Sequence, residues 1–205
     1  QLLTRGLDDE IRERLEIRTK FTGEAVDKKT MRYLRGARFE QLTYKLMKNL
    51  KPEVFDDVIW HGKVGKWGLP IPAQKVSEQT GKKLPDVLAF QNNNVYVVET
   101  TLLRGRAQWE KPEAVSVPDH IESMIATFKE RKVSGLFIAE KLDPSVEANL
   151  VTRAINKGYR VVPMEANDFF QTIKLLTKNP AKDFWSSYYD QLWNVHKRAA
   201  TRKES

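Results

Sequence analysis

The segment KKLPDVLAFQNNNVYVVETT restricts the possible folds more than any other part of the chain. Its two apolar runs flank three asparagines, and this pattern predicts an antiparallel β-hairpin. Asparagine tolerates the left-handed backbone of tight turns, which favours a turn at Asn92-Asn93. Such a turn sets Asp86 directly opposite Glu99 on one face of the hairpin. A register slip of two residues would leave the two acids as diagonal neighbours.

Like charges that face each other destabilise a β-sheet, so we expect a cation to lie beside Asp86 and Glu99. This cation can be a lysine, an arginine or a metal ion. Carboxylate oxygens suit Mg²⁺ far better than zinc, and the chain has no cysteine that would favour zinc. The alternative is that both acids are exposed at the strand ends, where water solvates them and no ligand binds.

A chain of 205 residues, with 40% hydrophobic and 30% charged residues, is long enough for one globular domain with a sizeable core. No apolar run predicts a membrane span, and the N-terminus lacks the apolar region of a signal peptide. The absence of cysteine excludes disulfides, thiolate nucleophiles and zinc–thiolate sites. These features fit a cytoplasmic protein of the prokaryotic, intracellular type. The first residue is Gln1 rather than methionine, which favours a fragment of a longer polypeptide or a processed chain.

The charge of the chain is positive and unevenly placed. The net charge is +8 and the isoelectric point is near 9.5, which favours a polyanion as partner. Residues 28–51 contain a single acid, Glu40, among eight cations. These cations are Lys28, Lys29, Arg32, Arg35, Arg38, Lys45, Lys48 and Lys51. The alternative interpretation is an ordinary solvated helix face.

The spacing of apolar residues along the chain predicts several helices and strands. Helices are expected over about 7–19, 28–50, 118–131, 145–158, 167–177 and beyond 180, and strands over about 53–62, 86–91, 95–101, 135–140 and 159–165. Residues 63–83, rich in Gly, Pro and Lys, are expected to form a long surface loop. This order predicts an α/β fold with a mixed sheet flanked by helices. We expect one domain over 1–205, with a helical extension over 1–27 and a closing helix over 180–205.

The two strand segments LPDVLAF and VYVVETT resemble the PD-(D/E)xK motif of restriction-endonuclease-like nucleases. The run ETTLLRGRAQWEKPEAVSVPDHI further resembles the cleavage domain of the AlwI-type family of type IIS restriction and nicking endonucleases. In that family the active-site strand carries Glu-x-Ser/Thr, followed by a Gly, a Gln, another Glu and a His that heads the next helix. The matching residues are Glu99, Thr101, Gly105, Gln108, Glu113 and His120. The segment GARFEQ matches the family's helical Gly-x-x-Phe-Glu context, which adds Glu40.

The resemblance implies a restriction-endonuclease-like fold and a nuclease site that uses Mg²⁺, for which Mn²⁺ may substitute. Asp86, Glu99 and Glu40 would hold the metal ion. A fourth acid, either Glu110 or Glu113, would lie near them. The spacing within the motif favours Glu113, whereas the distance along the chain from Glu99 leaves Glu110 open.

One position departs from the orthodox motif. The lysine expected two residues after Glu99 is replaced by Thr101, a departure that AlwI-type enzymes share. The group that orients or deprotonates the attacking water is therefore unassigned. Gln108 or Lys111 could take this role, or water activated by the metal alone could suffice.

The resemblance also implies double-stranded DNA as the substrate. The basic side chains expected to contact it are Arg35, Arg38, Lys45, Lys63, Lys66, Arg104, Arg106 and His120. One such site cuts one strand, so a double-strand break requires a recognition domain or large subunit with its own site, or a second copy of the chain. The alternatives are another nuclease of the same fold, such as a junction resolvase or repair nuclease, and a catalytically inactive DNA-binding or assembly domain.

Overall fold

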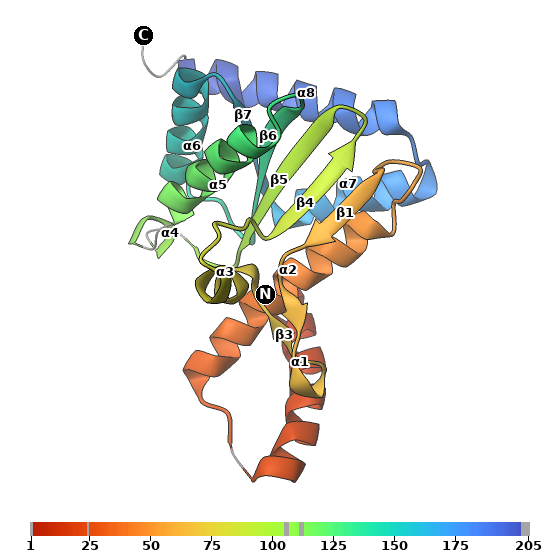
Figure 1. Ribbon diagram of the computed structural model, residues 1–205, viewed down its shortest axis with the longest axis vertical. Helices are drawn as coiled ribbons and strands as arrows, with labels where there is room; N and C mark the ends of the chain where they lie inside the picture. Colours follow the sequence, from red (N-terminus) through yellow and green to blue (C-terminus); the bar gives the residue numbers. More distant parts are fainter. Residues whose placement is uncertain (1, 24, 105–106, 111–112, 202–205) are drawn as a thin grey trace.

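A computed structural model describes residues 2–23, 25–104, 107–110 and 113–201. Its centre is a five-stranded mixed sheet with the strand order β1-β4-β5-β6-β7 (Figure 1). The strands are β1 (Asp57–Trp60), β4 (Val87–Gln91), β5 (Asn94–Thr101), β6 (Lys132–Ala139) and β7 (Arg160–Glu165). The first three strands pair antiparallel, and β5, β6 and β7 pair parallel. The predicted mixed sheet is confirmed.

The hairpin has the predicted register. In the β4–β5 ladder Val87 faces Val98 and Gln91 faces Asn94, which leaves a two-residue turn at Asn92-Asn93. Asn92 has φ of 50°, the left-handed conformation that such a turn requires. Continued by one residue beyond the ladder, this register places Asp86 opposite Glu99.

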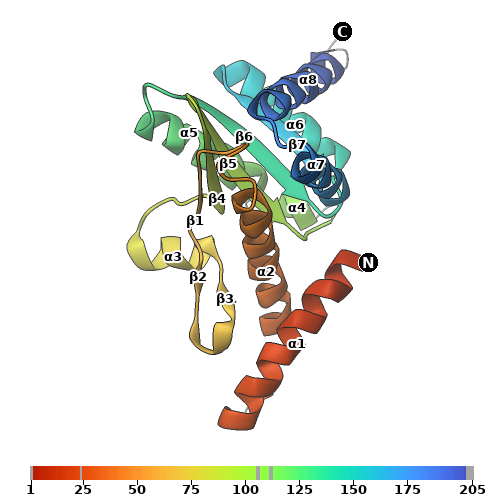
Figure 2. The same cartoon turned by 90° about the vertical axis from the view of Figure 1, so that its right-hand side faces the viewer.

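Helices cover both faces of the sheet. They are α2 (Lys28–Lys48), α5 (Glu113–Thr127), α6 (Pro144–Lys157), α7 (Ala166–Lys178) and α8 (Lys182–Thr201), with the short α4 (Ala107–Glu110) ahead of α5. Figures 1 and 2 show α5 and α6 on one face and α2 and α7 on the other, with α8 across one end. The central strands carry runs of buried aliphatic residues because both of their faces are covered.

Helix α5 lies unusually close to β6. An ideal Cβ built on Gly135 would come within 2.3 Å of Ile121 Cδ1 and 3.1 Å of Val161 Cγ2, so a larger residue here would force its neighbours to shift. The helix begins at Glu113, five residues before Pro118, the start that the sequence predicts. That prediction is wrong because proline favours, but does not require, the first helical position. Within α5, His120 lies two residues after Pro118, and its side chain reaches Glu99 of β5.

The segment after β1 is not the long loop that its composition predicts. It contains the two-stranded ribbon β2 (Lys63–Val64) and β3 (Pro70–Ile71), joined by the 3₁₀ turn η1 (Lys66–Gly68), and then helix α3 (Ala73–Thr80). The strands are too short for their periodicity to be recognised in the sequence. Strand β1 is also shorter than expected, because residues 51–54 form a turn.

Helix α1 (Leu2–Thr22) extends beyond the predicted 7–19 and packs beside α2. Ion pairs join Asp8 to Arg35 and Glu10 to Arg38 across the two helices. In Figure 2 this pair of helices and the ribbon project away from the sheet. No described helix is long and apolar enough to cross a membrane.

Candidate active site

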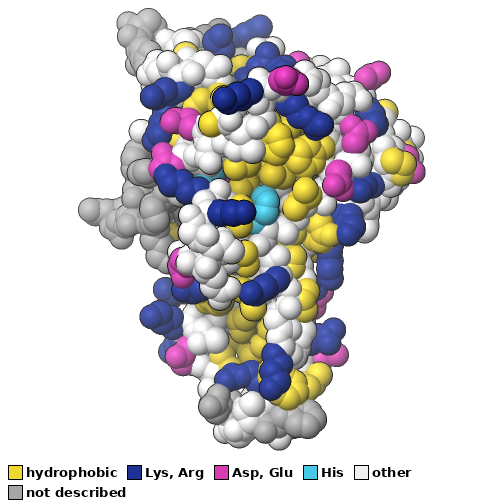
Figure 3. Space-filling view, in the orientation of Figure 1, with side chains coloured by type: hydrophobic (Ala, Val, Ile, Leu, Met, Phe, Trp, Pro, Cys, Tyr) yellow, Lys and Arg dark blue, Asp and Glu magenta, His cyan; other side chains and the backbone are white. Residues whose placement is uncertain are grey.

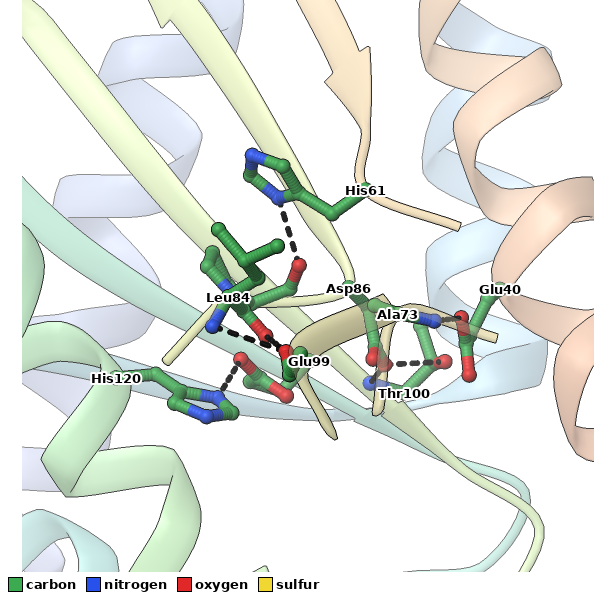
Figure 4. Close-up of polar contacts among 10 residues, drawn as sticks. Glu40, His61, Ala73, Leu84, Asp86, Glu99, Thr100 and His120 are labelled. Atoms are coloured by element: carbon green, nitrogen blue, oxygen red, sulfur yellow. Dashed lines mark hydrogen bonds and ion pairs between the residues drawn. The ribbon is translucent and has the colours of Figure 1, made fainter. Parts of the chain in front are cut away.

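Three carboxylates from separate elements gather at one end of the sheet. Glu40 comes from the middle of α2, Asp86 directly precedes β4, and Glu99 lies near the end of β5 (Figure 4). Glu40 and Glu99 are each only 7% exposed. Acids are rarely buried without a partner or a ligand, so this gathering requires a physical explanation.

Asp86 is held by the strand that it faces. Its Oδ2 accepts hydrogen bonds from the Thr100 backbone N–H at 2.8 Å and from the Thr100 hydroxyl at 2.9 Å. Burial, together with the charges of Glu40 and Glu99, raises the pKa of Asp86 well above its ordinary value, against the effect of these bonds. The side chain is therefore fixed in orientation while its negative charge is unfavourable.

Glu40 is the single acid of the cationic helix, and it points to the same place. Its Oε2 accepts a hydrogen bond of 2.9 Å from the Ala73 backbone N–H and a longer one of 3.5 Å from Trp60 Nε1. Burial raises the pKa of Glu40 to about 8, and the charge of Glu99 adds to the effect, although both hydrogen bonds lower the pKa.

Glu99 turns away from Asp86 toward α5. Its Oε1 lies 2.6 Å from Nδ1 of His120. Burial raises the pKa of Glu99, while the contact with His120 lowers it. Burial also disfavours a charged His120, but the hydrogen bond and charge of Glu99 outweigh it, so the pKa of His120 is raised. The contact therefore favours the charged forms of both side chains, whereas burial disfavours them.

A second histidine, which the sequence analysis did not single out, lies beside the site. His61 follows β1, and its Nδ1 lies 2.8 Å from the carbonyl oxygen of Pro85. Its backbone N–H donates to the Asp86 carbonyl oxygen at 3.1 Å. Burial is the main cause that lowers the pKa of His61, and the nearby His120 adds to it. The strand pairing of β1 with β4 explains this placement, and only a predicted β1–β4 pairing could have revealed it.

The donor chemistry of the three acids fits a hard divalent cation. The charges of Glu40 and Glu99 raise the pKa of Asp86, and the charge of Glu99 raises the pKa of Glu40, so a bound cation would relieve a repulsion within the group. Among the side chains that the structure describes, no three Asp, Glu or His groups converge closely enough to form a ready-made metal cage. A metal ion would have to draw the carboxylates closer together, and Glu40 Oε1, which does not accept the Ala73 N–H, could then serve as its ligand.

Gln108, which the sequence analysis names as a possible water-orienting residue, is held by the backbone of two loops. Its side chain donates to the carbonyl oxygens of Leu103 and Lys141, both at 2.7 Å, and accepts from the Asp143 N–H at 3.1 Å. The side chain is completely buried and fastens two loops together. The backbone engages its polar atoms, so this arrangement favours a structural role, and the catalytic role of Gln108 stays a prediction.

Several of the predicted DNA-contacting cations have acidic partners. Arg35 and Arg38 pair with α1, as described above, and Arg104 pairs with Glu140. These arginines have a structural role that the sequence does not show. Lys45, Lys63 and Lys66 are exposed.

Some predicted site residues lie outside the described part of the chain. The side chains of Glu110 and Glu113 are among them, although α4 and α5 include both backbones. Arg106, Lys111 and Gly105 are likewise not described. The choice between Glu110 and Glu113 stays a prediction. Thr101, which replaces the motif lysine, is buried at the end of β5 and accepts a hydrogen bond from the Leu103 N–H at 3.1 Å.

A mixed sheet whose hairpin ends in two facing acids, with a third acid from the preceding helix, defines a nuclease core of the restriction-endonuclease type. The model of the AlwI restriction endonuclease family matches residues 36–172, and the chain belongs to this family. The predicted resemblance is thereby confirmed.

A solved structure with the same fold is the small subunit of the heterodimeric restriction endonuclease R.BspD6I. The TM-score is 0.64 at 17% sequence identity, and the match covers 83% of this chain and 89% of that one. At this identity the likeness concerns the fold. No curated protein matches the chain significantly.

Proposed function

We propose that this chain is the DNA-cleaving domain or subunit of a type IIS restriction or nicking endonuclease, acting with Mg²⁺ and hydrolysing one strand per active site. The observation that carries the proposal is the meeting of Glu40, Asp86 and Glu99 in a buried, mutually repulsive group. Membership of the AlwI restriction endonuclease family supports a nuclease role.

Glu40, Asp86 and Glu99 would hold the metal ion, and Mn²⁺ could replace Mg²⁺ because it accepts the same oxygen ligands. Bound there, the metal supplies Lewis-acid polarisation of the scissile phosphate and activation of water. Thr100 fixes the Asp86 carboxylate, and His120 does the same for Glu99. These contacts orient the ligands before the metal arrives, as outer partners of a metal site commonly do.

Recognition of the DNA sequence would come from another domain or subunit. The fold is similar to that of a small subunit in a heterodimeric restriction endonuclease, which supports a large subunit as the partner. A second copy of this chain is the alternative. As a restriction enzyme, it would act on DNA inside the cell.

The decisive experiment incubates supercoiled plasmid with the chain and Mg²⁺, alone and with its partner subunit. Supercoiled, nicked and linear forms are scored separately. Metal-dependent nicking or cutting that disappears with EDTA is expected. No cleavage under any of these conditions, with a folded chain and an active partner, would refute the proposal.

One observation favours a second candidate, a catalytically inactive DNA-binding or assembly subunit. Thr101 stands where the orthodox motif has lysine, so the usual water-orienting amine is missing. Calorimetric titration with Mg²⁺ or Mn²⁺ separates the two functions. A nuclease should bind metal in a manner that depends on Asp86 and Glu99, whereas an inactive subunit should bind little.

A further inference from the structure

The ribbon formed by residues 62–72 is flanked by His61 and Ala73, and both of these residues contact the segments that carry the acids. At the first end, His61 contacts the carbonyl oxygens of Pro85 and Asp86 through its side chain and backbone. At the second end, the Ala73 N–H donates to Glu40. Figure 4 shows His61 beside the acids and the Ala73 contact between Asp86 and Glu40. One end of the ribbon therefore adjoins the Glu40 carboxylate directly, and the other adjoins the backbone of Asp86.

The ribbon is tightly built rather than loose. A Cβ on Gly62 would lie 2.3 Å from the Trp60 ring and 2.5 Å from the Ile71 carbonyl oxygen. On its inner side, Leu69 packs against the cluster of Ile11, Leu15 and Leu34 that joins α1 to α2. The β3 side is therefore braced, and the β2 side faces outward.

The outward side carries cations and no acid. Lys63 and Lys66 are exposed, and Val64 between them is 58% exposed. Lys63 Nζ donates to the uncharged Gln79 at 3.0 Å, and no described acid forms an ion pair with Lys63. The sequence has no Asp or Glu from 58 to 77. Figure 3 shows lysine and arginine side chains interleaved with apolar ones over this lower part of the face.

The tip of the ribbon holds a strained residue. Trp67 has φ of 66°, a left-handed conformation that is unfavourable for a bulky side chain. Lys66 Nζ lies 5.1 Å from the centre of the Trp67 ring. Strain of this kind persists where the surrounding structure enforces it, and it is concentrated at functional sites.

The shape of the ribbon, two short antiparallel strands joined by a turn, suits a nucleic-acid groove. The major groove of DNA is about 12 Å wide and admits a two-stranded β-ribbon. A duplex whose phosphate reaches the carboxylates would therefore have one groove beside the ribbon.

We propose that the ribbon is a DNA-positioning element. Lys63 and Lys66 contact phosphates beside the scissile bond, and the ends of the ribbon set Glu40 and Asp86 according to that contact. The inference rests on the proposed nuclease function and adds the element that places the substrate.

The first test removes the two charges. Lys63→Ala/Lys66→Ala is compared with Lys129→Ala/Lys157→Ala, which removes the same charge from exposed positions at the opposite end of the sheet. Duplex binding is measured against salt concentration with the complete enzyme, partner included. Each lost phosphate contact should lower the log–log slope by about 0.9, so the ribbon variant should lose roughly 1.8 and the control much less. Lys63→Arg/Lys66→Arg should restore binding.

The second test concerns the link to Glu40. Ala73 is the first residue of α3, a position that accepts proline, so Ala73→Pro removes the N–H donor to Glu40 without breaking the helix. Ala73→Val adds bulk and keeps the N–H. Compared with Ala73→Val, Ala73→Pro should lower kcat at least tenfold with little change in KM.

The outcomes separate this inference from the proposed function. An enzyme that cleaves DNA but whose ribbon variant keeps the wild-type salt slope would overturn the inference and leave the function standing. Equal kcat values for Ala73→Pro and Ala73→Val would overturn the link to Glu40. A wild-type complex that neither binds nor cleaves duplex DNA would overturn the function and this inference with it.

Discussion

At the scale of single residues, the main feature is the free-energy cost of burying the acids. Asp86 and Glu99 face each other across a hairpin, where like charges are destabilising. Both have raised pKa values because burial disfavours their charged forms. A fold that keeps such a pair sacrifices stability, and the proposed metal binding at the same place would account for it. Functional sites commonly conflict with local stability in this way.

Substitution of either acid should remove the cleavage activity and leave the protein folded. Asp86→Ala or Glu99→Ala is expected to abolish cleavage and leave DNA binding intact, because the cations that contact phosphate are elsewhere. Without metal, the thermal midpoint should stay the same or rise, since a repulsive pair is lost. Cleavage assays, duplex binding and thermal unfolding test this. Near-wild-type activity of either variant would show that the metal-site assignment is wrong.

Glu40 should make the stability of the metal-free protein depend on pH. Its pKa is raised to about 8 in the folded chain, so the folded state retains a proton that the unfolded state has released. Stability should therefore fall as the pH rises from about 4.5 to about 8, the interval between the unfolded and folded pKa values. Glu40→Gln should flatten this dependence. Thermal or urea unfolding at several pH values, with EDTA present, gives the measurement.

At the scale of secondary-structure elements, two close contacts set the geometry of the site. Strand β6 and helix α5 approach closely at Gly135, and this approach brings His120 to Glu99. The pairing of β1 with β4 brings His61 to Asp86. Each contact depends on residues far apart in the chain, so the site is a product of packing between elements.

Gly135→Ala should therefore affect both stability and activity. The added methyl would meet Ile121 and push α5 away, which should cost about 1–3 kcal/mol and lower cleavage by separating His120 from Glu99. Gly36→Ala is the matched control. A Cβ at position 36 would have no neighbouring atom within 4 Å, so Gly36→Ala should stabilise α2 by about 0.5–1 kcal/mol. Urea unfolding and cleavage rates are compared; equal effects of the two substitutions would contradict this account.

At the scale of the whole molecule, the proposed catalytic group lies at one end of the sheet. It consists of Glu40, Asp86 and Glu99, and the proposal assigns one such group to each copy of the chain. One group supports one in-line attack on a phosphodiester. A single copy of the chain is thus suited to cutting one strand.

The order of plasmid products should reflect this. A monomeric chain is expected to convert supercoiled plasmid to the open-circular form before any linear form appears, or to do nothing alone. Double-strand breaks should require the partner subunit or dimerisation. Gel analysis over time, with the oligomeric state measured at assay concentration, gives the test. Direct, concerted linearisation by a proven monomer would reveal an additional active site.

The sequence alone determined the hairpin, its register and the facing acids. These follow from local rules: alternating apolar residues define the strands, and the asparagine turn defines which residues pair. The motif resemblance added Glu40 and the family, and the family is confirmed. Helix α2 ends within two residues of the prediction, because its spacing is long and regular.

Only the tertiary structure decided how those acids are surrounded. In the structure, Arg35 and Arg38 pair with α1, and Gln108 is buried between loops. His61 lies beside Asp86, and the expected loop over 63–83 is a ribbon followed by a helix. No local pattern encodes these outcomes. Each depends on which distant elements pack together. Burial of the shared hydrophobic core determines that packing, and the local sequence does not.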